Sequence, residues 1–145
     1  MLKINEKELV AFISECSKFY ADKKNEIIKV YEIKLSENEI HIIDEIAIPE
    51  KVTIIQNNQV SINIKYLIYL CLNFQKNGTG MLIVHNHGQQ STPSPIDLST
   101  KKQLIKIIEY YNIYPFVFSI YSKSQFYYCI HSQSNEYSDY IINIT

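Results

Sequence analysis

The sequence predicts an α/β (α+β) fold in which a mixed central β-sheet is flanked by helices. Three segments repeat apolar residues at the 3.6-residue period of a helix, and several shorter segments are rich in β-branched and aromatic residues. The two kinds of segment are interspersed along the chain. With 145 residues, of which 46% are hydrophobic, the chain is long enough to bury a core, and we expect a single domain over residues 1–145.

The N-terminal part is expected to contain a helix followed by a hairpin. Asn5 is a favourable N-cap residue, Glu8 completes a capping box, and apolar residues follow at helical spacing until the helix ends near Asp22. Residues 27–35 and 40–48 are rich in strand-forming residues and are separated by a short polar turn. They therefore predict a β-hairpin.

The remaining elements are a short strand, a helix, a continuous apolar strand, a third helix and a closing hairpin. In that order they span residues 52–55, 64–74, 81–84, 98–111, and 116–121 with 126–130. Residues 88–95 are rich in Gln, Ser, Thr and Pro, so we expect a loop there.

Composition excludes several classes of function. The net charge is −1 and all 14 basic residues are lysine, so we expect no nucleic-acid partner. The N-terminus has no signal-peptide pattern, and the apolar stretch 66–74 is too short to span a bilayer, so we expect no membrane partner. Cys16, Cys71 and Cys129 lie in apolar stretches and predict buried thiols in a reducing, cytoplasmic environment.

Two histidines and an aspartate carry the strongest chemical signal. His85 and His87 close the apolar strand, where residues two apart point to the same face of a sheet. Asp97 follows after a loop, at the start of the third helix. Two imidazoles and a carboxylate form the ligand set of a catalytic zinc site with an open fourth position, where a bound water becomes acidic near neutral pH.

A structural interpretation of the aspartate stays open at this point. Ser94-Pro95-Ile96-Asp97 is also a complete helix start, with Ser94 as N-cap, Pro95 at N1 and Asp97 closing a capping box. In that case Asp97 needs no metal.

These residues resemble a known motif. His85-Asn86-His87 followed by Pro93-Ser94-Pro95-Ile96-Asp97 is similar to the JAMM motif of the MPN (JAB-type) metalloprotease family. That motif reads His-x-His-Pro, a loop, and Pro-Ser-x-x-Asp, with a glutamate far upstream. The order of elements over about residues 9–130 is also similar. The resemblance implies an MPN-like fold, which is a cytidine-deaminase-like sandwich.

The resemblance also implies a role for each matching residue. His85, His87 and Asp97 would bind Zn²⁺, and Glu26 would be the general base that accepts a proton from water. Ser94 would help to hold the oxyanion of the tetrahedral intermediate.

The identity of the glutamate is the most open of these assignments. Glu26 is preferred because it follows a polar stretch and comes directly before the first strand. Glu32 lies six residues further on and is the next candidate, and Glu45 and Glu50 lie in or near the second strand.

The implied function is that of a zinc-dependent metallopeptidase or isopeptidase acting at the C-terminal tail of a ubiquitin-like protein. The chain departs from the motif in having Gly88 instead of Pro, and six residues instead of seven between His87 and Ser94. A non-catalytic MPN scaffold, a RadC-like MPN protein and a two-His-one-carboxylate iron oxygenase are the alternatives. The sequence predicts no particular oligomeric state.

Overall fold

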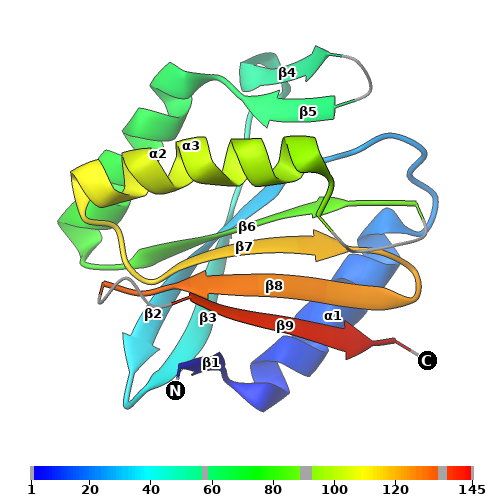
Figure 1. Cartoon of the computed structure of the whole chain (residues 1–145), viewed down its shortest axis with the longest axis horizontal. Coiled ribbons are helices and arrows are strands. Elements are labelled where there is room, and N and C mark those ends of the chain that lie inside the picture. The colour runs from blue at the N-terminus through cyan, green and yellow to red at the C-terminus, as the bar shows by residue number, and fades with distance from the viewer. Residues whose placement is uncertain (1, 57–58, 89–92, 134–136, 145) are drawn as a thin grey trace.

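The computed structural model describes residues 2–56, 59–88, 93–133 and 137–144 (Figure 1). Its elements, in chain order, are β1 (Lys3–Ile4), α1 (Glu6–Tyr20), β2 (Lys29–Ser36), β3 (Glu39–Ile46), the 3-10 turn η1 (Glu50–Val52), β4 (Thr53–Gln56), β5 (Gln59–Ile62), α2 (Ile64–Asn77), β6 (Gly80–Asn86), α3 (Pro95–Tyr111), β7 (Phe116–Tyr121), β8 (Gln125–His131) and β9 (Tyr137–Asn143).

A curled, mixed seven-stranded sheet forms the centre of the fold, in the order β1-β3-β2-β6-β7-β8-β9. Strand β6 lies in the middle, antiparallel to β2 and parallel to β7. Every residue of β6 is buried, which explains its continuous apolar sequence, because a strand covered on both faces has no solvent-facing side.

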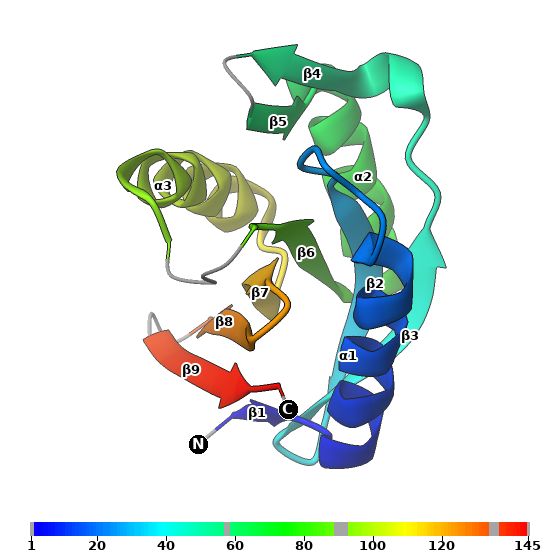
Figure 2. The same ribbon diagram turned by 90° about the vertical axis from the view of Figure 1, so that its right-hand side faces the viewer.

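Helices cover both faces of this sheet (Figure 2). Leu9, Phe12 and Cys16 of α1 pack on one face, against side chains such as Leu82 and Val84 of β6. The other face carries α2 and α3, whose apolar residues form a second core with alternate residues of the same strands. This arrangement confirms the predicted class of a mixed sheet flanked by helices.

The predicted hairpin is confirmed as β2 and β3. Its turn contains Glu37 and Asn38 with φ of 51° and 68°, the left-handed backbone that a two-residue hairpin turn requires. The helix boundaries differ from the predicted ones by up to three residues: α1 ends at Tyr20, and α3 begins at Pro95.

Three strands were not expected from the sequence: β1, β5 and β9. Strand β9 lies at an edge of the sheet and pairs only with β8 among the described residues. Its side chains alternate between exposed and half-buried, and several are polar, so the segment carries no clear apolar pattern. The sheet curls far enough that the Tyr140 hydroxyl of β9 donates to the Leu2 carbonyl beside β1, at 2.9 Å.

All three cysteines are buried and free, as predicted. Among the described residues, no helix combines the length and the apolar character needed to span a bilayer.

Candidate metal centre

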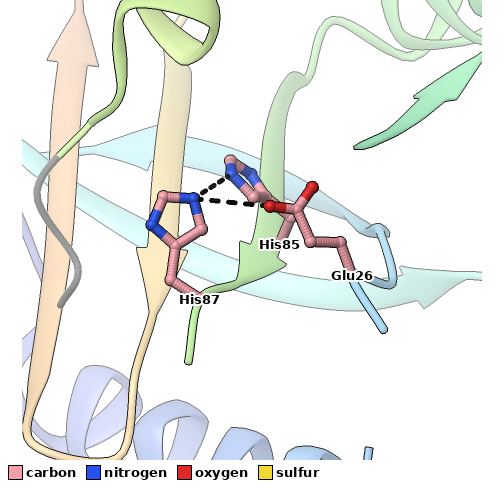
Figure 3. A group of neighbouring side chains, drawn as sticks. All are labelled: Glu26, His85 and His87. Carbon is pink, nitrogen blue, oxygen red and sulfur yellow. Dashed lines mark hydrogen bonds and ion pairs between the residues drawn. The ribbon is translucent and has the colours of Figure 1, made fainter. Parts of the chain in front are cut away.

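The two histidines lie at the end of β6 and turn the same ring nitrogen toward each other. His85 is in the strand and His87 follows it directly, and their Nε2 atoms are 3.2 Å apart (Figure 3). The His85 ring packs against Phe118 in a T-shaped arrangement, with ring centroids 5.7 Å apart. The His87 backbone N–H donates to the Tyr121 carbonyl at 2.8 Å, which holds the residue beside β7 although it lies beyond the strand.

Asp97 reaches the same point from the first turn of α3. Its Oδ1 lies 3.1 Å from His85 Nε2, and its Oδ2 lies 3.1 Å from His87 Nε2. All three side chains are mostly shielded from solvent. The structure therefore brings together the three residues that the sequence predicted as metal ligands.

Hydrogen bonds alone cannot satisfy this triangle of contacts. A neutral imidazole has at Nε2 either one proton or one lone pair. If both rings donate to Asp97, two N–H groups face each other across 3.2 Å; if one ring accepts from the other, it has no proton at Nε2 for the carboxylate. Three electron-pair donors converging on one point form the arrangement that a shared cation satisfies.

The distances fit such a cation. Two ligands bound at about 2.0–2.1 Å to a tetrahedral Zn²⁺ lie about 3.3 Å apart. The two Nε2 atoms are 3.2 Å apart, and each lies 3.1 Å from a different oxygen of Asp97. The separation of the two nitrogens is therefore compatible with a shared cation.

Asp97 also caps its own helix. The Ser94 N–H donates to Asp97 Oδ2 at 2.8 Å, and the Asp97 N–H donates to Ser94 Oγ at 3.1 Å, which completes the predicted capping box. Cap and ligand are therefore compatible, since Oδ1 stays directed at His85 while Oδ2 both takes part in the cap and faces His87.

The charge of Asp97 suits both roles. Burial alone would raise the pKa of Asp97, but hydrogen bonds to His85 and His87 and the Ser94 N–H outweigh it and hold the pKa well below its usual range. The carboxylate is therefore anionic at neutral pH, as a metal ligand must be.

Glu26 lies at the open side of the histidine pair. Its Oε1 is 3.6 Å from His87 Nε2 (Figure 3), and ligand atoms of Glu26, His85 and His87 all lie within 4.8 Å of one another. The first strand was predicted to start at residue 27, directly after Glu26, but β2 begins two residues later, at Lys29. Glu26 belongs instead to the irregular segment between α1 and β2, and its side chain is 25% exposed.

The three other candidate glutamates lie elsewhere in the structure. Glu32 accepts hydrogen bonds from Asn77, the last residue of α2, and from Thr79. These contacts lie next to the start of β6 and not at its histidine-bearing end. Glu45 pairs with Lys29 at 3.1 Å, and Glu50 lies in η1. These positions leave Glu26 as the glutamate beside the histidines.

Ser94 lies at the N-terminus of α3, with its hydroxyl oxygen accepting the Asp97 N–H. This bond uses a lone pair of Oγ, so the hydroxyl proton is still available for donation. Residues 89–92 of the predicted loop lie outside the described residues.

Asn86 is the site residue that sequence reasoning missed. As expected from strand alternation, its side chain points away from the two histidines. Its amide instead contacts the segment that carries Glu26: Oδ1 accepts from the Ile27 N–H at 2.7 Å, and Nδ2 donates to the Asn25 carbonyl at 3.1 Å. No local signal identifies these partners, which lie 59 and 61 residues away in the chain.

A mainly apolar pocket of about 180 Å³ is lined by residues of α2, α3, β5 and β6, and none of the site residues lines it. Three of its lining residues lie two or three positions from a site residue, and one side is formed by β5. The lining residues include Ile28, Ile83 and Thr100, together with Val60 and Ile62 of β5.

No model of a known protein family matches this chain, and no curated protein matches it in sequence.

Proposed function

We propose that this protein is a zinc-dependent metallopeptidase or isopeptidase of the JAMM/MPN type, with an MPN-like fold. The observation that carries the proposal is the triangle formed by His85, His87 and Asp97, whose contacts of 3.1–3.2 Å suit a shared cation better than a set of hydrogen bonds. The order of helices and strands around β6 supports the same family.

His85 Nε2, His87 Nε2 and Asp97 would hold the ion and leave its fourth position open. Zn²⁺ bound there supplies a Lewis acid for a carbonyl oxygen and acidifies a coordinated water. Asp97 is preferred to Glu26 as the third ligand because it contacts both imidazoles at 3.1 Å, whereas Glu26 lies 3.6 Å from only one of them.

Glu26 acts as the general base and then as the general acid. Its Oε1 is close enough to the centre to accept a proton from the attacking water, and it later returns that proton to the leaving amine. With a quarter of its side chain exposed, Glu26 can also exchange its proton with solvent between turnovers.

Ser94 stabilises the charge that develops on the carbonyl oxygen. Its Oγ is held by the Asp97 N–H, so the hydroxyl is fixed beside the ligands while its proton is still available. A donor aimed at an oxyanion in a partly buried site is worth about 100-fold or more in rate.

The surroundings of the site favour an extended peptide as substrate. The apolar pocket is lined by Ile28 and Ile83, which lie two positions from Glu26 and His85, and it accepts an aliphatic side chain. In the described part of the chain β5 pairs only with β4, so its second edge can pair with an added strand. The C-terminal tail of a ubiquitin-like protein, free of regular structure, meets both requirements.

Metal content tests the centre directly. We would measure metals by mass spectrometry in untagged protein prepared without added zinc, comparing wild type with His87→Ala and the control His41→Ala. His41 pairs with Glu8 on α1, and its removal leaves the cluster intact. We expect about one zinc per chain in wild type and in His41→Ala, and none in His87→Ala.

Other results have defined meanings. If none of the three proteins contains zinc, Ser94 and Asp97 serve only as a helix cap. The function as a non-catalytic scaffold would then be favoured. Iron in place of zinc would favour an oxygenase. Zinc without release of the tail from an amide-linked ubiquitin-like probe would reject the peptidase while keeping the metal centre.

A further inference from the structure

We infer that Asn86 is a positioning residue for the general base: its side-chain amide holds the segment that carries Glu26 and so sets the distance between Glu26 and the histidines. The catalytic part of this inference rests on the function proposed above. The evidence comes from the pairing of β2 with β6, the two hydrogen bonds of Asn86 and a second anchor from α1.

The pairing of β2 and β6 stops just before the site. The last paired residues are Lys29 and Val84. Continuing the same antiparallel register would place Ile27 opposite Asn86 and Glu26 opposite His87. Glu26 thus faces His87 by register, although the backbones no longer form a ladder there.

The Asn86 side chain takes the place of the missing ladder. A carboxamide has the same donor and acceptor groups as a peptide unit. Asn86 Oδ1 accepts from the Ile27 N–H at 2.7 Å and Nδ2 donates to the Asn25 carbonyl at 3.1 Å, so the amide binds the residues on both sides of Glu26. Beside the histidines, the connection between the two segments therefore runs through a side chain and not through a backbone ladder.

A second contact completes the attachment of the segment. The Tyr20 hydroxyl, at the end of α1, donates to the Ile27 carbonyl at 2.9 Å. Tyr20 is buried and stacks on Tyr121 of β7, with ring centroids 5.5 Å apart. The two polar backbone groups of Ile27 are therefore both bound to side chains of regular elements.

Glu26 needs such support because it lies outside helix and strand. Irregular segments move more than the elements that they connect unless their backbone is tied down. A displacement of about 1 Å in a catalytic group costs about 100-fold in rate. Asparagine suits this position because aspartate lacks the donor, and leucine, although similar in volume, lacks both groups.

Amide hydrogen exchange at Ile27 tests the attachment without using activity. In the purified protein, we expect Asn86→Ala and Asn86→Leu to raise the exchange rate of the Ile27 N–H by about 10-fold or more. Ser17→Ala is the control, because it removes a part-buried hydrogen bond to Tyr121 on the same side of the sheet. An unchanged Ile27 rate in Asn86→Ala, or an equal rise in Ser17→Ala, would overturn the inference.

Steady-state kinetics test the catalytic consequence. We expect Asn86→Ala to keep about one zinc per chain and an unchanged KM, and to lose about 10- to 100-fold in kcat. If Asn86 acts only through Glu26, the double variant Glu26→Gln/Asn86→Ala will be no slower than Glu26→Gln alone. A full multiplicative loss in the double variant would instead indicate a general structural role.

The two levels of failure are distinguishable. If wild-type protein with bound zinc hydrolyses no amide-linked ubiquitin-like probe, the proposed function fails, and with it the catalytic part of the inference. The exchange rate of Ile27 still decides whether Asn86 holds the segment. If wild type is active and Asn86→Ala is equally active, the positioning role alone is rejected.

Discussion

Asp97 is the residue on which the local and the distant interactions of the site depend. Its carboxylate accepts from the Ser94 N–H at the start of α3, and it faces both histidines from β6. The helix start therefore fixes the direction of the carboxylate, and the carboxylate in turn ties α3 to the end of β6.

Exchange of Glu26, the proposed general base, is the most direct test at the residue scale. Glu26→Gln keeps the size of the side chain and removes its ability to accept a proton. We expect about one zinc per chain and a loss of about 100-fold to 10,000-fold in kcat. Glu32→Gln is the matched control, since Glu32 contacts Thr79 and Asn77 away from the histidines. Full activity in Glu26→Gln would show that another group moves the proton.

Comparison with a second helix cap distinguishes the capping role of Ser94 from its proposed role in catalysis. Ser94 caps α3 and Asn63 caps α2, where its Oδ1 accepts from the Lys65 N–H at 2.9 Å. We expect Ser94→Ala and Asn63→Ala each to lower the free energy of unfolding by about 1 kcal/mol in urea titrations. Only Ser94→Ala should also lower kcat. Equal activity in the two variants would limit Ser94 to capping.

Strand β6 is the element that places the site. It lies between β2 and β7 in the middle of the sheet, so a neighbouring strand on each side fixes its position along the sheet. Its first residue, Gly80, approaches the backbone of Pro115 so closely that an added Cβ would lie 2.0 Å from the Pro115 carbonyl oxygen. Its last residues carry the histidine and asparagine of the site.

Two glycine substitutions test how strongly stability depends on the close packing of β6. Gly80 is the first residue of the strand, and Gly88 lies two residues after its end. We expect Gly80→Ala to lower the free energy of unfolding by about 1–3 kcal/mol or more, because the Pro115 backbone must move. Gly88→Ala should change it by less than about 0.5 kcal/mol, since no atom of the described residues lies within 4 Å of the added Cβ. Chemical denaturation of both variants checks the difference, and equal stability would contradict the close approach seen at Gly80.

At the scale of the whole molecule, the site joins parts of the fold that are distant in sequence. The histidines at the end of β6 contact Asp97 at the start of α3 and Glu26 in the segment before β2. A bound ion would therefore connect three separate segments and oppose their separation on unfolding.

Removal of metal should lower the stability of the entire protein. An ion that binds only the folded state stabilises it by about 2.7 kcal/mol when its free concentration is 100 times Kd. For a chain of this size we expect a chelator to lower Tm by about 8 °C, and added zinc to restore it. In calorimetry His87→Ala should show no such shift, and a shift of equal size in that variant would place the stabilising ion elsewhere.

The cysteines report on the packing of the two cores. Burial raises the pKa of the Cys16 thiol to about 12, and those of Cys71 and Cys129 each to about 11. At pH 8 all three are protonated and shielded, so we expect no reaction of the native protein with a thiol reagent. All three should react in denaturant. Rapid labelling of one thiol in native protein would indicate that its core opens locally.

The sequence by itself determined what depends on neighbouring residues. Apolar spacing predicts the three helices and the β2–β3 hairpin. The capping box at Ser94 follows from side chains that bond within one helical turn. The same local geometry places His85 and His87 on one face of a strand end. These features were therefore predictable, as were the three groups that meet in the triangle.

The tertiary structure alone decided which distant residues join them. Glu26 and Glu32 were both compatible with the sequence. In the structure Glu32 pairs with Met81, and Glu26 comes within 3.6 Å of His87 just beyond the last pair of β2 with β6. The partners of Asn86 and the edge strand β9 depend in the same way on the pairing of the sheet. Register is set by burying both faces of the sheet at once, which is a property of the assembled cores and not of any short segment.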